Sequence, residues 1–189
     1  LGEGTSHFDS HADTSAGGSN FIMLDRPEQV HNHVDVSPFS DEYEPIKGIP
    51  VATCATAYTD PVNGEVYILV FHQMLYFGKK LSHSLICPNQ IRDNGNSVEE
   101  CPRMYNPASR HGVTLKSEDG DNDLFIPMEM EGTISYINTR FPTEEELASC
   151  KHYVATSLEK IWDPHSSNFR IAEEAANRAT PRNLSSVMK

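Results

Sequence analysis

The clearest pattern along the chain is a pair of β-compatible segments joined by a turn. Residues 49–58 are compatible with a β-strand, and residues 65–72 are rich in β-branched and aromatic side chains. Residues 60–64 lie between them and contain a Pro and an Asn-Gly pair, which are typical of a tight turn. The pattern predicts an antiparallel hairpin with Asn63 and Gly64 at its tip.

Other segments predict shorter elements. Pro88, followed by a closing Asn-Gly, predicts one short helix over residues 88–95. Thr143, with Glu146 three residues later, forms a capping-box pattern that predicts a helix start. Gly132 is expected at a turn between two strands. The other expected elements are a strand at 21–24, an apolar stretch at 74–77, a loop-rich segment at 96–122, strands at 124–132 and 134–139, and a helix at 171–179.

Short β runs separated by Gly, Pro and Asn turns indicate an all-β fold with short helices. The chain has 189 residues, enough for one domain or for one domain with an extension. We expect a core over residues 1–95. Residues 96–170 are expected to form an additional β-rich region, either of the same domain or as a small lobe, and residues 171–189 a C-terminal helix or linker.

The formal net charge of −12 restricts the partners of this chain. Binding to nucleic acid needs clustered Lys and Arg, whereas the basic residues here are scattered, so no nucleic-acid contact is expected. No apolar run approaches the roughly 20 residues that cross a bilayer, so no membrane contact is expected either. The four cysteines lack Cys-x-x-Cys spacing, which favours reduced thiols in an intracellular, cytoplasmic setting.

Residues 9–14 are the main candidate for chemistry, with the sequence Asp-Ser-His-Ala-Asp-Thr directly after Phe8. Asp and Ser often bond to their own backbone, so a purely structural turn is one interpretation. The segment also resembles the Asp-Ser/Thr-Gly-Ala-Asp/Thr loop of retropepsins, the retroviral-type aspartic proteases.

Several further segments are similar to copia-type retrotransposon polyproteins, in which this loop often reads Asp-Ser-His-Ala-Asp-Thr-Cys. The resemblance covers roughly residues 8–165. It implies a retropepsin-like closed β-barrel with a flap hairpin and a C-terminal extension. The segments that carry it are 40–47, 57–61, 67–70, 75–78, 83–92, 126–128, 132–136 and 140–147.

This resemblance implies an endopeptidase that processes its own polyprotein as a homodimer, in the cytoplasm or in a virus-like particle, without metal or cofactor. Asp9 of each subunit would be the catalytic carboxylate. The two would share one proton, because two like charges so close together cannot both ionise. One carboxylate would activate a water while the protonated one bonds the scissile carbonyl. The implied substrate-binding or loop-bracing residues are Ser10, Ala12, Asp13 and, at the flap tip, Asn63 and Gly64.

Two positions keep other functions open. His11 stands where retropepsins have Gly, and Ser15 stands where a Cys would be expected. A Cys-type peptidase, with position 15 as nucleophile and His11 as base, is therefore an alternative, in which Ser15 would be an inactivating change. A non-catalytic module retained for dimerisation or peptide binding is a further alternative.

Two weaker signals lie outside the loop. His31 and His33 would share one face of a strand with Asp35, an arrangement that zinc could use with a further ligand. Exposed strand histidines are the commoner explanation, and no metal is expected. Trp162, the single Trp of the chain, is expected to anchor the C-terminal tail by packing.

Overall fold

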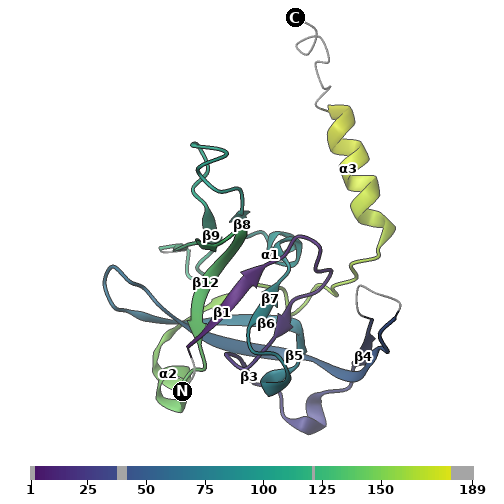
Figure 1. The fold of residues 1–189 in the computed structure, drawn as a ribbon, viewed down its shortest axis with the longest axis vertical. Helices are drawn as coiled ribbons and strands as arrows, with labels where there is room; N and C mark the ends of the chain where they lie inside the picture. Colours follow the sequence, from purple (N-terminus) through teal and green to yellow (C-terminus); the bar gives the residue numbers. More distant parts are fainter. Residues whose placement is uncertain (1–2, 38–41, 121, 180–189) are drawn as a thin grey trace, which may run out of the picture.

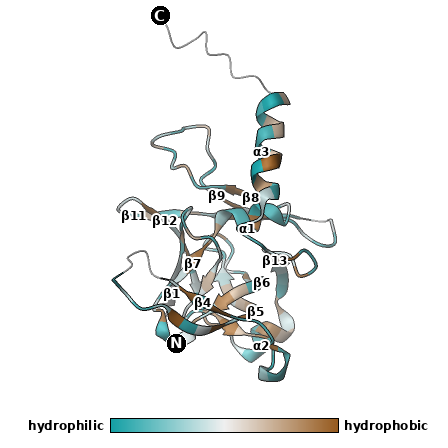
Figure 2. Ribbon diagram, turned by 90° about the vertical axis from the view of Figure 1, so that its right-hand side faces the viewer, coloured by the Kyte–Doolittle hydropathy of each residue, from teal (hydrophilic) through white to brown (hydrophobic). Residues whose placement is uncertain are grey.

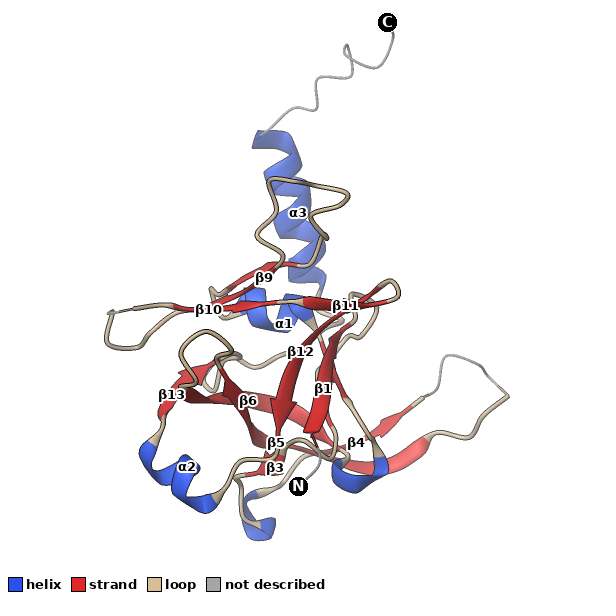
Figure 3. Cartoon of the chain, turned by 60° about the vertical axis from the view of Figure 1, so that its left-hand side comes forward, coloured by secondary structure: helices blue, strands red, loops and turns tan. Residues whose placement is uncertain are grey.

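The computed structural model describes residues 3–37, 42–120 and 122–179. Strands account for 39% of these described residues and helices for 18%, so the expected predominance of β-structure is confirmed (Figures 1 and 3). Most strands belong to one 10-stranded sheet, and a second sheet has three strands.

Eight strands of the main sheet follow the order β11-β12-β1-β7-β2-β6-β5-β3. Two others branch from this path: β13 pairs with β6, and β4 pairs with β5. An additional pairing, Arg140 with Ala57, links β12 to β5. The strands are β1 (Glu3–Phe8), β2 (Ala16–Gly17), β3 (Ile22–Met23), β4 (His33–Val36), β5 (Ile46–Thr59), β6 (Val66–Tyr76), β7 (Ser84–Ile86), β11 (Glu129–Glu131), β12 (Ile134–Arg140) and β13 (Lys151–Val154).

The smaller sheet has the order β10-β9-β8 and lies beside α1 in Figure 3. Its strands are β8 (Ser97–Glu99), β9 (Gly112–Leu115) and β10 (Leu124–Pro127). The helices are α1 (Pro88–Asp93), α2 (Glu144–Ser149) and α3 (Ser167–Ala179), with short 3-10 turns η1 (Pro27–Gln29) and η2 (Gly78–Lys80).

The predicted hairpin is the longest paired unit of the fold. β5 and β6 pair antiparallel from Val51 opposite Leu75 to Thr59 opposite Val66, with an irregularity between Ala52 and Cys54. Figure 2 shows hydrophobic residues along these strands. Consecutive buried positions, as at Ile68 and Leu69, show that both faces of the hairpin are covered. The predicted helix at Pro88 and the capping box at Thr143 are also confirmed.

One hydrophobic core joins the two halves of the chain. Phe21 and Phe71 meet edge to face within it, with ring centroids 5.5 Å apart. The same cluster contains Ile126 of β10 and Tyr153 of β13. Residues from both sides of position 95, up to Ala155, therefore share one hydrophobic core.

The segment expected to be loop-rich, residues 96–122, consists mainly of loops and contains two short strands, β8 and β9. The last helix, α3, begins at Ser167 instead of residue 171, has no buried residue, and projects from the body of the molecule in Figure 1. An exposed helix of this length gains little from packing, so its side-chain pairs matter, such as Arg170 with Glu174 one turn later.

Candidate functional site

A buried polar network fixes the strand from which the candidate loop emerges. The Asn20 side chain donates hydrogen bonds to Ser6 Oγ of β1 at 3.1 Å and to Thr139 Oγ1 of β12 at 2.7 Å. Its carbonyl oxygen accepts a bond from Ser84 Oγ of β7 at 2.6 Å. A buried amide with several satisfied bonds holds its partners in one arrangement, so β1, β7 and β12 are locked together.

The loop starts where β1 lies parallel to β7. Phe8 is paired with Ile86, and the next amide, that of Asp9, donates to the Ile86 carbonyl at 3.1 Å. The Ala12 amide then donates to the Asp9 carbonyl at 3.1 Å, which closes a tight turn. The turn therefore leaves the sheet at a defined point.

The Asp9 carboxylate is accessible to solvent. One of its oxygens, Oδ1, accepts a hydrogen bond from the His11 amide at 2.8 Å, while 43% of the Asp9 side chain remains exposed. The His11 ring is 97% exposed, with Nδ1 3.7 Å from Asp9 Oδ1. Among the described residues, the hydrogen bond and the close charged contact of the Asp9 side chain both involve His11.

Ser15 has a different environment from the rest of the loop. It is fully buried, its amide donates to Gln90 Oε1 at 3.0 Å, and its hydroxyl oxygen accepts from the Cys87 amide at 3.0 Å. Ser15 therefore binds the end of the loop to the start of α1. The structure does not bring its hydroxyl to the solvent-facing ring of His11, which argues against a nucleophile at position 15.

The C-terminal segment reaches the loop, which sequence reasoning missed. The indole nitrogen of Trp162 donates to the Asp13 carbonyl at 3.0 Å and to Thr14 Oγ1 at 3.2 Å. His165 Nε2 lies 3.6 Å from Asp13 Oδ2. Trp162, as the single Trp of the chain, predicted a packing anchor for the C-terminal tail. It did not predict a hydrogen bond to the loop.

A hollow of about 640 Å³ lies beside the loop. Ser10, His11, Ala12 and Asp13 form its loop side, so the structure gathers these four predicted residues around one space. α1 forms a second side and the C-terminal segment a third. The lining from these two sides consists of Cys87, Asn89, Arg92, Asp93, Trp162, Pro164, Phe169 and Glu173.

The tip of the β5–β6 hairpin is not part of this group. Asn63 and Gly64 are exposed and do not line the hollow. Figure 1 places the tip on the opposite side of the molecule from the loop after β1. The reason is the length of β5, which has 14 residues: its start pairs with β4 and the remainder with β6, so the turn is carried away from β1. Within one chain, this hairpin does not cover the loop.

His33 lies on β4, and His31 precedes this strand. Among the described residues, no group of three or more His, Cys, Asp or Glu side chains is placed to hold an ion. His31 and His33 are exposed. Asp35 Oδ1 instead accepts the Gly48 amide at 2.9 Å, which supports the local backbone at a glycine with φ of +67°.

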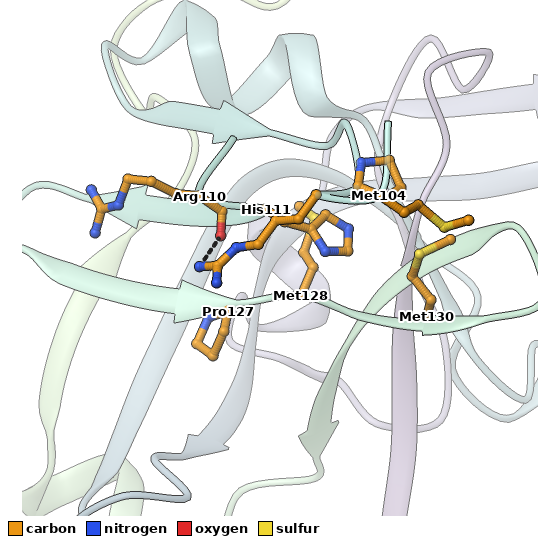
Figure 4. Close-up of a pocket in the computed structure, with 8 residues that line it drawn as sticks. Met104, Arg110, His111, Pro127, Met128 and Met130 are labelled. Carbon is orange, nitrogen blue, oxygen red and sulfur yellow. Dashed lines mark hydrogen bonds between the residues drawn. The ribbon is translucent and has the colours of Figure 1, made fainter. Parts of the chain in front are cut away.

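A second hollow, of about 400 Å³, lies near the three-stranded sheet (Figure 4). Met104, Met128 and Met130 line it together with His111. Arg103 donates to the Arg110 carbonyl at 3.1 Å, and the Arg110 guanidinium stacks 3.9 Å from the Phe125 ring centroid. Burial lowers the pKa of His111, and nearby Arg103 lowers it further. The Arg103 and Arg110 side chains of this hollow therefore already have partners within the chain.

Comparison with known proteins gives no relative: no family model, curated protein or solved structure matches the chain. In the part of the chain that the structure describes, no helix is both long and apolar enough to span a membrane. Function is therefore inferred from the residues of this chain.

Proposed function

We propose that this chain is a retropepsin-like aspartic endopeptidase of a copia-type retroelement, which cleaves its own polyprotein as a homodimer. One observation carries the proposal: an accessible Asp9 carboxylate on a tight loop whose two ends are fixed by hydrogen bonds to Ile86 and Cys87. A reacting carboxylate has to be both reachable and held in place, and this loop meets both requirements.

The arrangement around the loop also supports the proposal. β1 leads into the loop, β7 lies parallel to β1 beneath it, and α1 follows β7 directly. The Arg140–Ala57 pairing brings β12 against β5 and so joins distant parts of the sheet order, as a closed barrel would require. A β-barrel that carries this loop is the architecture that the sequence resemblance implies.

The mechanism follows from two Asp9 carboxylates that meet across a twofold axis. Mutual repulsion raises the affinity of the pair for one proton. The ionised carboxylate then takes a proton from water as the water attacks the scissile carbonyl, and the protonated partner donates to the carbonyl oxygen. Ser10, Ala12 and Asp13 line the adjacent hollow, and in this proposal they contact the peptide.

His11 is the strongest reason to keep a second function in view. Its side chain stands where retropepsins have Gly, next to Asp9, and its amide already bonds the Asp9 carboxylate. A protonated imidazole beside the dyad would stabilise the doubly ionised, inactive form. The alternative is a non-catalytic module that dimerises or binds peptide through the same face. The Cys-type alternative has less support because position 15 is buried.

A cleavage assay on a precursor fragment separates these functions. Replacing Asp9 with Asn should lower the rate by roughly 10²- to 10⁴-fold, the usual contribution of a general acid or base. Asp119→Asn makes the same chemical change at an exposed position on another loop and should leave the rate unchanged. Cleavage that survives Asp9→Asn would refute the aspartic mechanism. No cleavage by any form, together with a stable dimer, would favour the binding module.

A further inference from the structure

The segment between β13 and α3, residues 155–166, crosses the molecule without regular secondary structure, and we call it the C-terminal strap. Figure 1 shows it as the yellow-green trace that leads to α3. It begins bound to β6, because the Ala155 amide donates to the Val70 carbonyl at 2.8 Å and Thr156 Oγ1 donates to the His72 carbonyl at 2.7 Å. The strap is thus attached to the sheet at its first residues.

Gln73 anchors the middle of the strap. Its side-chain amide donates to the carbonyls of Ser157 and Lys160, both at 2.8 Å, and its side-chain oxygen accepts the Trp162 amide at 2.8 Å. Gln73 adopts a φ of +54°, which is unfavourable for a residue with a side chain. Backbone strain of this kind persists only where surrounding contacts impose it, and three bonds to the strap are such contacts.

A second chain of bonds runs from the same residue to the candidate loop. Gln90 of α1 donates to the Gln73 carbonyl at 3.0 Å and accepts the Ser15 amide at 3.0 Å. Lys160 of the strap also pairs with Asp93 at the end of α1. The strap, α1 and the end of the loop are therefore parts of one hydrogen-bonded unit.

Trp162 of the strap connects this hydrogen-bonded unit to Asp13 and Thr14 of the loop. Its indole N–H is shared between the Asp13 carbonyl and Thr14 Oγ1, and its ring packs against Phe169 at 5.6 Å between centroids. Ser10, His11 and Asp13 are exposed, so the loop itself makes few packing contacts. Segments with little packing open at low free-energy cost unless specific bonds restrain them.

We infer that the C-terminal strap sets the conformation of the loop at residues 9–14, with Trp162 as the positioning residue. The expected effect on cleavage rests on the proposed function, because the loop carries Asp9, the proposed catalytic residue. The bonds to Ile86 and Cys87 hold the two ends of the loop, and the bonds from Trp162 add a restraint at Asp13 and Thr14 that residues 1–95 do not supply. The segment after residue 95 supplies the restraint, from a position 149 residues away in the chain.

The test replaces the indole N–H and measures the loop directly. Trp162→Phe keeps an aromatic ring but removes the shared hydrogen bond. Losing one such bond corresponds to roughly a 5- to 10-fold increase in local opening. In the 189-residue chain, amide hydrogen exchange at residues 12–15 should rise by about that factor, while exchange in β5 and β6 stays the same. Phe169→Leu, which alters the ring contact and leaves the N–H bond, is the matched control and should show little change at these amides.

A second variant guards against a folding defect. Thr14→Val removes one of the two acceptors and should raise exchange at the same amides by about two- to threefold, in the same direction. If the protein cleaves peptide, Trp162→Phe should lower kcat with KM nearly constant, because a loop that samples other conformations is less often competent. Unchanged exchange at residues 12–15 in both variants would overturn the inference. Faster exchange without any cleavage by the parent would retain it and refute the proposed function instead.

Discussion

The backbone amide of Cys87 donates a hydrogen bond to Ser15 Oγ at 3.0 Å, inside the protein. The two residues are separated by 72 positions in the sequence, and their bond ties the end of the candidate loop to the start of α1. The hydroxyl at position 15 therefore has a structural task. A side chain with this task is poorly placed to attack a peptide.

Removing that hydroxyl should destabilise the fold. Ser15→Ala leaves the Cys87 amide buried without an acceptor, which should lower the free energy of unfolding by about 1–3 kcal/mol. Ser10→Ala, at an exposed position of the same loop, should change it by less than about 0.5 kcal/mol. Urea unfolding of the three proteins measures both changes. Equal effects at the two positions would contradict the structural role of Ser15.

The pair of Arg140 and Glu146 should make stability depend on pH in the acid range. Bonds from the Arg140 guanidinium, 2.5 and 2.8 Å long, and from the Thr143 amide hold the pKa of Glu146 at about 2. Because this pKa lies below the unfolded value of 4.5, the stabilisation is complete above pH 4.5. It is lost as the pH falls towards 2.

Glu146→Gln tests this directly. The change should cost about 1–2 kcal/mol at neutral pH, a figure reduced from the full pKa shift to allow for solvent screening. The cost should shrink as the pH falls from 4.5 towards 2. Glu145→Gln, on the exposed side of α2, is the control and should show a much smaller cost. Thermal unfolding across this pH range gives the result, and a cost for Glu146→Gln that is the same at pH 2 and pH 7 would exclude the account.

The four cysteines should react with alkylating agents at very different rates. Burial, with a smaller effect of nearby Asp25, raises the pKa of Cys54 to about 12, so about one thiol in ten thousand is ionised at pH 8. Burial also raises the pKa of Cys87. Cys101 is exposed and should be modified first, with Cys150 next. Mass spectrometry after a brief treatment with iodoacetamide measures the order in which the cysteines react. Early labelling of Cys54 would contradict its burial in the core.

Local signals in the sequence were sufficient for several elements. The Asn63-Gly64 turn between two β-rich runs predicted the β5–β6 hairpin, since the turn and both strands are neighbours in the chain. The spacing of Thr143 and Glu146 predicted the start of α2 for the same reason. The four loop residues that line the hollow could also be named, because they are consecutive.

Long-range pairings could not be predicted in the same way. β1 contains polar residues such as Ser6, which are buried only because Asn20 and Thr139 satisfy them. β13 has four residues and depends on a parallel partner, β6, far earlier in the chain. The contact of Trp162 with Asp13 is of this kind too. Such features depend on the assembled fold and leave little pattern in any short window.

The most direct test of the central claim, that two Asp9 carboxylates act together in a dimer, is a subunit-mixing measurement. Parent chain and Asp9→Asn chain are mixed in equal amounts at constant total concentration, and cleavage of a precursor peptide is measured after exchange is complete. If each active site needs Asp9 from both copies, random pairing predicts about one quarter of the parent rate. About one half of the parent rate would mean that each chain acts alone, and would contradict the claim.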